Sequence, residues 1–339
     1  MHPLLRRLIS RLFQLLLVLW GTVTIVFLVG RVLPADPAVV LSGPNATSEI
    51  VEATRAALGL DKPLPVQYGA YLVSLLQGDL GRSLISGRPV LTDLAARVPA
   101  SLELVTAALV LAVSAAFVCG LQAALKPDSL WPKVNKALVT GGTAVPTFLL
   151  GILLLYAFYI KLPIAPAPLG RMGIGPASIE NGTGFLVWDA LLRGRWDVLF
   201  SALHHLLLPS ITLAFTVFPQ LVQVFHSNVA TVLSSDAYKA VKLAKLPFRM
   251  VLWRYLIPPA VAPALNLLAA SFGYMIGGTV LVEHIFGWNG LGAYVLNGIN
   301  AGDHAVVQGV VLVSALCYSL AFFIVDVAMY FIDPRLREV

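Results

Sequence analysis

The chain has 339 residues, of which 58% are hydrophobic and only 12% are charged, and its mean hydropathy is +0.84. A water-soluble protein of this length needs a far more charged surface, so the composition indicates that the lipid bilayer is its solvent. The formal net charge is +6, but membrane topology explains the scattered lysines and arginines better than a phosphate-binding patch does, and we expect no nucleic-acid partner.

Six apolar segments are long enough to cross a bilayer as helices. They lie at about residues 12–32, 101–123, 136–160, 201–226, 260–284 and 306–331. Arginines precede the first segment, as in a signal peptide. Its apolar run is too long for that role and lacks a small-residue cleavage site, so we interpret it as an uncleaved anchor. An even number of spans places both termini on one side of the membrane.

Positive charge predicts which side of the membrane is cytoplasmic. Segment 227–258 holds five lysines and arginines, whereas segment 285–305 holds none. We therefore expect the basic segment and both termini to be cytoplasmic, and segments 31–99, 161–199 and 285–305 to lie outside.

The first outer segment is polar and carries several turn signals. Between these turns, about 47–59 and 66–77 are predicted to be helical, which gives a small extracytoplasmic cap of short helices. We expect an all-α polytopic membrane protein in two parts. Residues 1–99 form the first membrane helix and this outer loop, and residues 100–339 form a core of five membrane helices with a cytoplasmic helix.

The basic cytoplasmic segment contains a short amphipathic helix with marked ends. Ser235 can cap its start, Lys242 and Lys245 suit its last turn, and Pro247 stops it. A face of mostly small apolar side chains recurs at helical spacing. This face consists of Leu233, Ala237, Ala240, Val241 and Ala244. Such a helix either docks into a groove on a soluble partner or lies flat on anionic lipid, and the residues themselves leave both open.

The third outer segment contains Ile-Phe-Gly-Trp-Asn-Gly-Leu-Gly at 285–292. This stretch is too rich in glycine to continue a helix, but it suits a re-entrant or scoop-like turn. Irregular backbone of this kind survives near a bilayer only when it is buried in protein or lines a wet cavity.

Charged side chains inside apolar segments are costly and often functional. Glu103 and Glu283 lie near outer ends of segments, where we expect them to reach interfacial water. Asp326 lies near the cytoplasmic end of the last segment, where we expect it to hydrogen-bond across helices or to extend toward water. The alternative is a substrate or proton path. No chain of such residues connects the two sides, which argues against a proton-coupled pump and for energy supplied by another protein.

Motifs for phosphate binding and catalysis are absent from the sequence. It contains no Gly-x-x-x-x-Gly-Lys-Ser/Thr, His-Glu-x-x-His, Gly-x-Ser-x-Gly or Cys-x-x-Cys. We expect no catalytic residue, metal site or cofactor in this chain, and no disulfide, because both cysteines lie in apolar segments. A secondary, ion-coupled transporter is the alternative function, but the acidic relay and inverted repeats expected of one are not visible. A membrane-bound enzyme is disfavoured because no nucleophile, base or metal ligands converge.

Six short segments carry a family pattern along the whole chain. They lie at 33–37, 58–68, 78–83, 285–292, 306–309 and 333–337. Together they resemble the inner-membrane permeases of ABC importers for dipeptides, oligopeptides and nickel, specifically the B-type permease. The resemblance implies a type I importer permease in a bacterial inner membrane, which forms half of a translocation pathway for peptides or related small solutes.

The resemblance also implies partners. They are a second homologous permease, two cytoplasmic ATPase subunits, an extracytoplasmic substrate-binding protein and the membrane lipid. Because ATP would be bound and hydrolysed by the partners, the chain itself would be a transport subunit and not an enzyme.

In such permeases the cytoplasmic helix is a coupling helix that seats in a groove of the ATPase. The matching positions here are Asp236, Lys239, Ala240, Val241, Lys242 and Lys245. Lys245 stands where the family usually has glycine, so we expect the turn after the helix to be made differently.

The outer turn departs from the family pattern as well. Asn289 replaces the usual turn proline, and Gly302-Asp303-His304 stands where Arg-Asp-Tyr is common. The positions expected near the docked binding protein are Trp288, Asn289, Gly290, Asp303 and His304. We expect these departures to bear on the choice of partner more than on the fold.

Overall fold

The computed structural model describes residues 3–32, 37–43, 45–173, 179 and 182–332. In these ranges the chain forms helices and no β-strand, apart from one isolated antiparallel bridge between Arg82 and Pro89. Residues 33–36 and 333–339, which carry most of the first and all of the last family segment, lie outside the described residues.

Five helices of the described chain are long and apolar enough to cross a membrane. They are α1 (Pro3–Val32), α5 (Val90–Leu125), α9 (Trp196–Ser234), α12 (Ile257–Phe286) and α14 (His304–Ile332). A sixth span is present only if a bent pair of helices is counted as one. The prediction of six spans is therefore met by five long helices and one broken one.

The broken span replaces the single helix expected over 136–160. It consists of α6 (Trp131–Ala144), α7 (Thr147–Leu155) and the π-helix η1 (Tyr156–Lys161). The two halves are bent by 104°. Pro146 lies at the bend and takes an extended ψ of 138° immediately before α7. Its ring also disfavours helical backbone at the preceding residue, so the helix cannot run straight through.

Short helices connect the spans. The outer cap consists of α2 (Pro37–Ser42), α3 (Ser48–Ala57) and α4 (Leu64–Leu76), which confirms the two helices predicted there. The others are α8 (Leu186–Leu192), α10 (Asp236–Leu243), α11 (Phe248–Val251), the π-helix η2 (Leu252–Leu256) and α13 (Leu291–Asn300).

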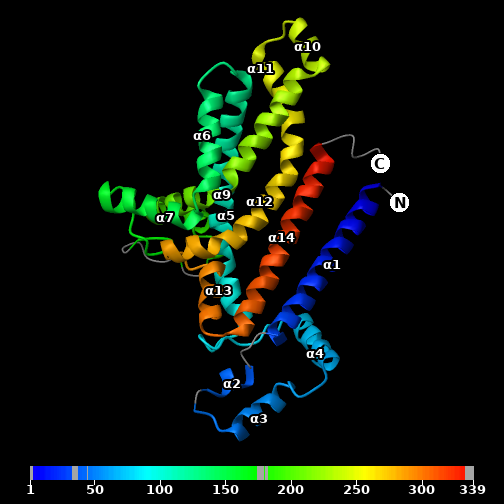
Figure 1. Cartoon of the computed structure of the whole chain (residues 1–339), viewed down its shortest axis with the longest axis vertical. Helices are drawn as coiled ribbons and strands as arrows, with labels where there is room; N and C mark the ends of the chain where they lie inside the picture. The colour runs from blue at the N-terminus through cyan, green and yellow to red at the C-terminus, as the bar shows by residue number, and fades with distance from the viewer. Residues whose placement is uncertain (1–2, 33–36, 44, 174–178, 180–181, 333–339) are drawn as a thin grey trace.

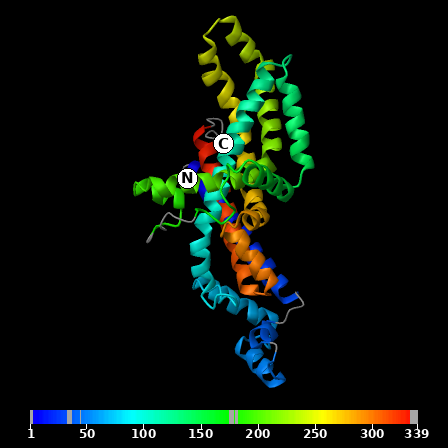
Figure 2. The same cartoon turned by 90° about the vertical axis from the view of Figure 1, so that its left-hand side faces the viewer.

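The molecule is elongated along the direction of its long helices. Helix α10 lies at one end, and α2 and α3 lie at the other (Figure 1). The same separation is visible from the side (Figure 2). Helices α1 and α14 run side by side, and Arg11 Nη2 lies 3.1 Å from Asp326 Oδ1 across their interface. The expectation that Asp326 bonds across helices is thereby confirmed.

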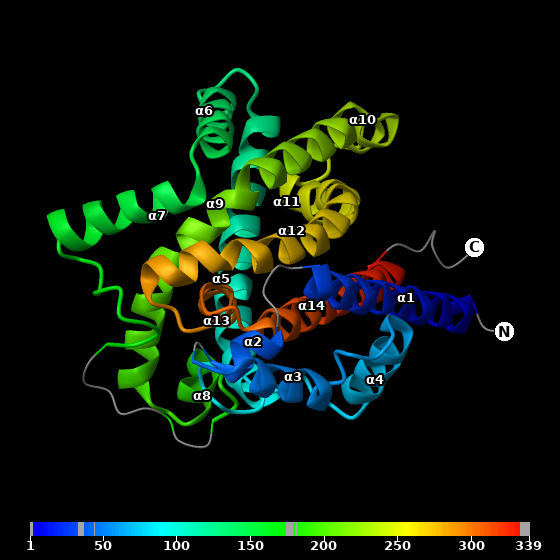
Figure 3. The same ribbon diagram turned by 60° about the horizontal axis from the view of Figure 1, so that its bottom comes forward.

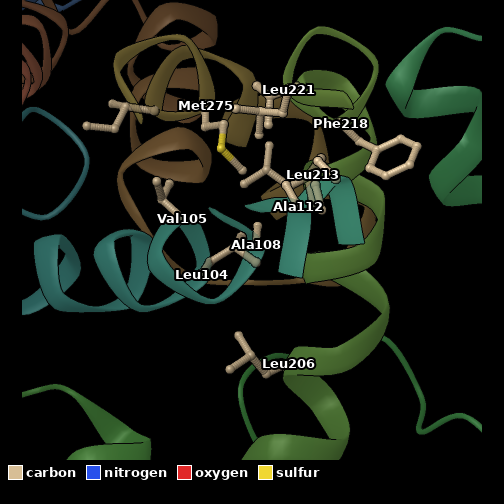
Figure 4. Close-up of a cluster of buried hydrophobic side chains, with 14 of the residues drawn as sticks. Leu104, Val105, Ala108, Ala112, Leu206, Leu213, Phe218, Leu221 and Met275 are labelled. Carbon is tan, nitrogen blue, oxygen red and sulfur yellow. The ribbon is translucent and has the colours of Figure 1, made fainter. Parts of the chain in front are cut away.

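Helices α5, α9 and α12 form the main core. Their buried side chains are mostly small or aliphatic, among them Ala108, Leu213 and Met275 (Figure 4). Gly120 marks the closest approach of α5 to α9, since a Cβ there would lie 2.9 Å from Phe225 Cβ. Small residues allow such contact between membrane helices. The core thus joins the two long helices, α9 and α12, that flank the α10 segment in the chain.

Candidate functional site

The residues expected to carry function fall into two groups that lie apart from each other in the molecule. The first group lies on α10, and the second lies on the turn between α12 and α13 and at the start of α14 (Figures 1 and 3). A signal that passes between these groups must travel through the core helices.

The predicted start of the cytoplasmic helix is confirmed. Ser235 Oγ accepts a hydrogen bond from the Tyr238 backbone N–H at 3.2 Å, so it caps α10. Lys239 Nζ lies 2.8 Å from Asp236 Oδ1 one turn away. Both side chains of this ion pair are largely exposed, so it contributes little to stability. The helix itself is therefore set by its cap, and its charges remain available for contact.

Helix α10 presents its surface outward. None of its residues is buried; Lys239, Ala240 and Lys242 are exposed, and Val241 is half-buried. The side chain of Leu243 is 83% exposed and that of Phe248 is 59% exposed. Exposed apolar side chains beside a face of small residues are typical of a contact surface.

Lys245 makes the turn after α10 with a glycine-like backbone. Its φ is +50°, and among the described residues it is the only non-glycine residue with a positive φ. The backbone at Lys245 thus takes the left-handed conformation that favours glycine, with a lysine side chain in place. The reason is that Ala244 and Lys245 still donate backbone hydrogen bonds to Ala240 and Lys242, which close the helix in left-handed geometry. That conformation costs a lysine roughly 1–2 kcal/mol.

In the second group, a buried carboxylate organises the turn between α12 and α13. Glu283 is fully buried; Ser101 Oγ donates to its Oε1, and the Ala293 backbone N–H donates to its Oε2 at 3.0 Å. The expectation that Glu283 reaches interfacial water is wrong, because α13 folds back and directs its first N–H groups at the carboxylate. Ser101 Oγ also accepts from the Leu291 N–H at 2.8 Å.

The predicted turn at 285–292 is confirmed, and it is packed into the protein. Gly287 ends α12 in the left-handed conformation, with φ +64°. Trp288 is 1% exposed and donates from Nε1 to the Ala100 carbonyl at 2.9 Å. A Cβ on Gly290 would collide with both Ser101 and Glu283. The fold therefore requires these residues in the turn.

Of this turn, Asn289 faces outward. Its Oδ1 accepts from Arg97 Nη1 at 2.9 Å, and the Arg97 guanidinium lies 4.5 Å from the centre of the Tyr294 ring. Burial above all, helped by the Asp93 carboxylate that the hydroxyl donates to, raises the pKa of Tyr294 to about 12. This hydroxyl is therefore protonated at neutral pH and acts as a donor.

Asp303 ties the outer loop to the last helix. It is 1% exposed. Its Oδ2 accepts from Ser83 Oγ at 2.9 Å and from the Leu84 N–H at 2.6 Å, and its Oδ1 accepts from the Val306 N–H at 3.2 Å. Asp303, which is the one residue of Gly302-Asp303-His304 that matches the family's Arg-Asp-Tyr, therefore caps α14. His304 is half-buried.

A part-buried ion pair was missed by sequence reasoning. Arg171, from the irregular second outer loop, pairs with Glu103, whose Oε1 accepts from the Val187 N–H at 2.7 Å. Glu103 is therefore held by partners from the protein, although it keeps part of its surface exposed. Nothing in the sequence links Arg171 to Glu103, just as nothing links Ser101 to Glu283, because each pair is formed by tertiary packing.

Comparison with known proteins decides the family. Residues 112–338 match the family described as binding-protein-dependent transport system inner membrane component, and residues 3–105 match its N-terminal region family. The chain belongs to this family. It is the permease subunit of an ABC importer, an inner-membrane protein that works with a substrate-binding protein.

Curated relatives match this permease over nearly their whole length. It is 36% identical to the probable D,D-dipeptide transport system permease protein DdpB of Escherichia coli, over 96% of both chains. It is 30% identical to the dipeptide transport system permease protein DppB of Alkalihalophilus pseudofirmus, over 96% of this chain and 98% of the relative. It is also 30% identical to the glutathione transport system permease protein GsiC of Salmonella choleraesuis, over 98% of this chain and 99% of the relative.

The burial of Trp288 predicts a stability effect. Replacing Trp288 by phenylalanine removes the bond to Ala100 and leaves a cavity, so it lowers the free energy of unfolding by about 2–3 kcal/mol. Trp188→Phe is the matched control, because Trp188 is 55% exposed and surface changes stay within about 0.5 kcal/mol. Thermal unfolding in detergent, followed by circular dichroism, compares the two. Equal midpoints would contradict the structural role of Trp288.

The backbone of Lys245 predicts an unusual response to glycine. Lys245→Gly relieves about 1 kcal/mol of left-handed strain, so deuterium exchange of the turn amides stays the same or slows. Lys245→Val speeds that exchange, because a β-branched side chain disfavours positive φ. Lys239→Gly, inside right-handed α10, is the control and loosens the helix by about 1 kcal/mol. If glycine loosened both positions equally, the left-handed turn would not be the native one.

Proposed function

We propose that this permease is one half of a heterodimeric importer that moves short peptides or related small solutes inward. A second homologous permease completes the pathway, two cytoplasmic ATPase subunits hydrolyse ATP, and an extracytoplasmic binding protein delivers the substrate. The substrate class is supported by the names of relatives that carry dipeptides, D,D-dipeptides or glutathione.

The proposal assigns the α10 end of the molecule to the cytoplasm, with both termini on that side. Five lysines and arginines in segment 227–258 support this orientation. Helix α1 also begins, and α14 also ends, toward the end that carries α10 (Figure 1). Residues 1–99 then form an N-terminal unit with the outer cap and residues 100–339 form the core, a division supported by the separate family matches over 3–105 and 112–338.

One observation supports the coupling role. Helix α10 is capped by Ser235, has no buried residues, and lies at the end of the molecule opposite α2 and α3. Asp236, Lys239, Ala240, Val241, Lys242 and Lys245 form the surface that contacts the ATPase. The exposed side chain of Leu243 enters the groove, and the lysines face acidic groups on the partner.

The packing of α9 and α12 explains how closure of the ATPases reaches the pathway. The two helices flank α10 in sequence and share one core with α5. A push on α10 therefore moves these helices as a body and switches the bundle between inward-open and outward-open states. At the outer end, Asn289 and His304 contact the binding protein, while Trp288, Gly290 and Asp303 hold that surface in shape.

Charge reversal on α10 tests the coupling role. In the assembled importer, Lys239→Glu with Lys242→Glu places like charges across the contact, whereas Asp236→Lys removes the carboxylate that orients Lys239 and puts a second cation beside it. We expect a loss of about tenfold or more in substrate uptake and substrate-stimulated ATP hydrolysis, with normal membrane insertion. Uptake and ATPase assays in proteoliposomes measure both quantities.

The matched control reverses two lysines in the other cytoplasmic segment. Lys126→Glu with Lys133→Glu changes the same charge but leaves α10 intact, and we expect near-normal uptake. Normal uptake by the α10 variants would contradict docking through this helix.

A further inference from the structure

A cavity of about 290 Å³ lies between α5, α6 and α9. It is lined by Ala123, Pro132, Asn135, Lys136, Val139, Val222, Gln223 and His226. Ala123 is close to the last residue of α5 and Pro132 is close to the first of α6, so the cavity lies near the end of the molecule that carries α10 (Figure 1). The transport mechanism described above does not use it.

One buried polar atom in this cavity lacks a hydrogen bond. Asn135 is 7% exposed. Its Nδ2 donates to the Cys119 carbonyl at 2.9 Å, which fixes the orientation of the amide. Its Oδ1 is buried and has no partner within the described chain. A buried acceptor without a donor is destabilising, so a donor that reaches Asn135 Oδ1 through the cavity would stabilise the fold.

The other polar side chains in the wall suit an anion. Lys136 carries a positive charge, and Gln223 and His226 offer N–H groups; all three are exposed at the edge of the cavity. No aspartate or glutamate lines it. Cations and amides around an opening between membrane helices on the cytoplasmic side match the phosphate of a lipid headgroup.

The surroundings of the cavity are those of the membrane interface. At the start of α6, Leu130 is 73% exposed, Trp131 is 39% exposed and Val134 is 43% exposed. A tryptophan next to exposed aliphatic side chains is typical of the level where headgroups meet acyl chains. The inner wall, which includes Val139 and Val222, is apolar and can contact the glycerol and the upper acyl carbons.

We propose that this cavity binds an anionic phospholipid of the cytoplasmic leaflet, with its phosphate on Lys136 and His226 and a headgroup hydroxyl donating to Asn135 Oδ1. Phosphatidylglycerol has both groups. The bound lipid bridges α6 to α5 and α9 close to the segment that carries α10. This inference rests on the proposed orientation of the molecule, but not on the docking of α10.

The test counts lipid in the full chain purified with its accompanying subunits. Mass spectrometry measures phosphatidylglycerol retained after detergent exchange in the unmodified protein, in Asn135→Leu and in Lys136→Gln. We expect about tenfold weaker retention in each variant, since each loses one strong hydrogen bond to the lipid. Lys133→Gln is the matched control, because Lys133 lies on the same helix and does not line the cavity.

Reconstitution separates the possible ligands. Delipidated protein in nanodiscs of phosphatidylcholine with added phosphatidylglycerol should unfold at a higher temperature than in phosphatidylcholine alone, and Lys136→Gln should abolish the difference. Stabilisation by inorganic phosphate in place of the lipid would overturn the proposal in favour of a free anion. Equal retention in Lys136→Gln and the unmodified protein would also overturn it. Neither measurement involves ATP. Lipid binding can therefore be tested even if the coupling role of α10 proves wrong.

Discussion

The Glu283 carboxylate is the interaction on which the outer half of this permease depends. It lies at the end of α12, with no exposed surface, and accepts hydrogen bonds from Ser101 on α5 and from Ala293 on α13. A buried carboxylate is tolerated only when its oxygens are satisfied, so the three helices must keep their relative positions. Trp288 packs beside these helices and donates to the Ala100 carbonyl, and Gly290 leaves room for Ser101 and Glu283 because it has no side chain. The turn between α12 and α13 is therefore part of the core, and Asn289 is its exposed polar side chain.

The exposed helix α10 is connected through the chain to the packed helices of the core. Helix α10 follows α9 in the chain, and α11 and η2 connect it to α12. Helices α9 and α12 share one core with α5, and Glu283 links α12 to α5 and α13. Helix α10 itself needs only a cap and a sharp turn, which Ser235 and Lys245 supply. The described structure thus combines a packed core of long helices with one exposed short helix, α10.

Local patterns in the sequence predicted much of this architecture. The long apolar runs, the two cap helices and the start of α10 at Ser235 each depend on neighbouring residues alone, and each is confirmed. The partners of the carboxylates inside the apolar segments depend on tertiary contacts. Glu103 and Glu283 look like interfacial residues in sequence, but Arg171 and Ser101 come from distant segments to meet them. A proline such as Pro146 can bend a span, and a lysine such as Lys245 disfavours the left-handed conformation. Only the surrounding structure decides that Pro146 bends its span and that Lys245 takes the left-handed backbone.

The most direct test of the coupling surface is site-specific photo-crosslinking in the assembled importer. A photoreactive amino acid at Ala240, on the exposed face of α10, should crosslink to an ATPase subunit, and the yield should change when ATP is bound. The same group at Asn289, on the turn between α12 and α13, should give no ATPase product. Labelling of lipid alone from Ala240, with no ATPase adduct in any nucleotide state, would show that α10 lies on the membrane and would contradict the account.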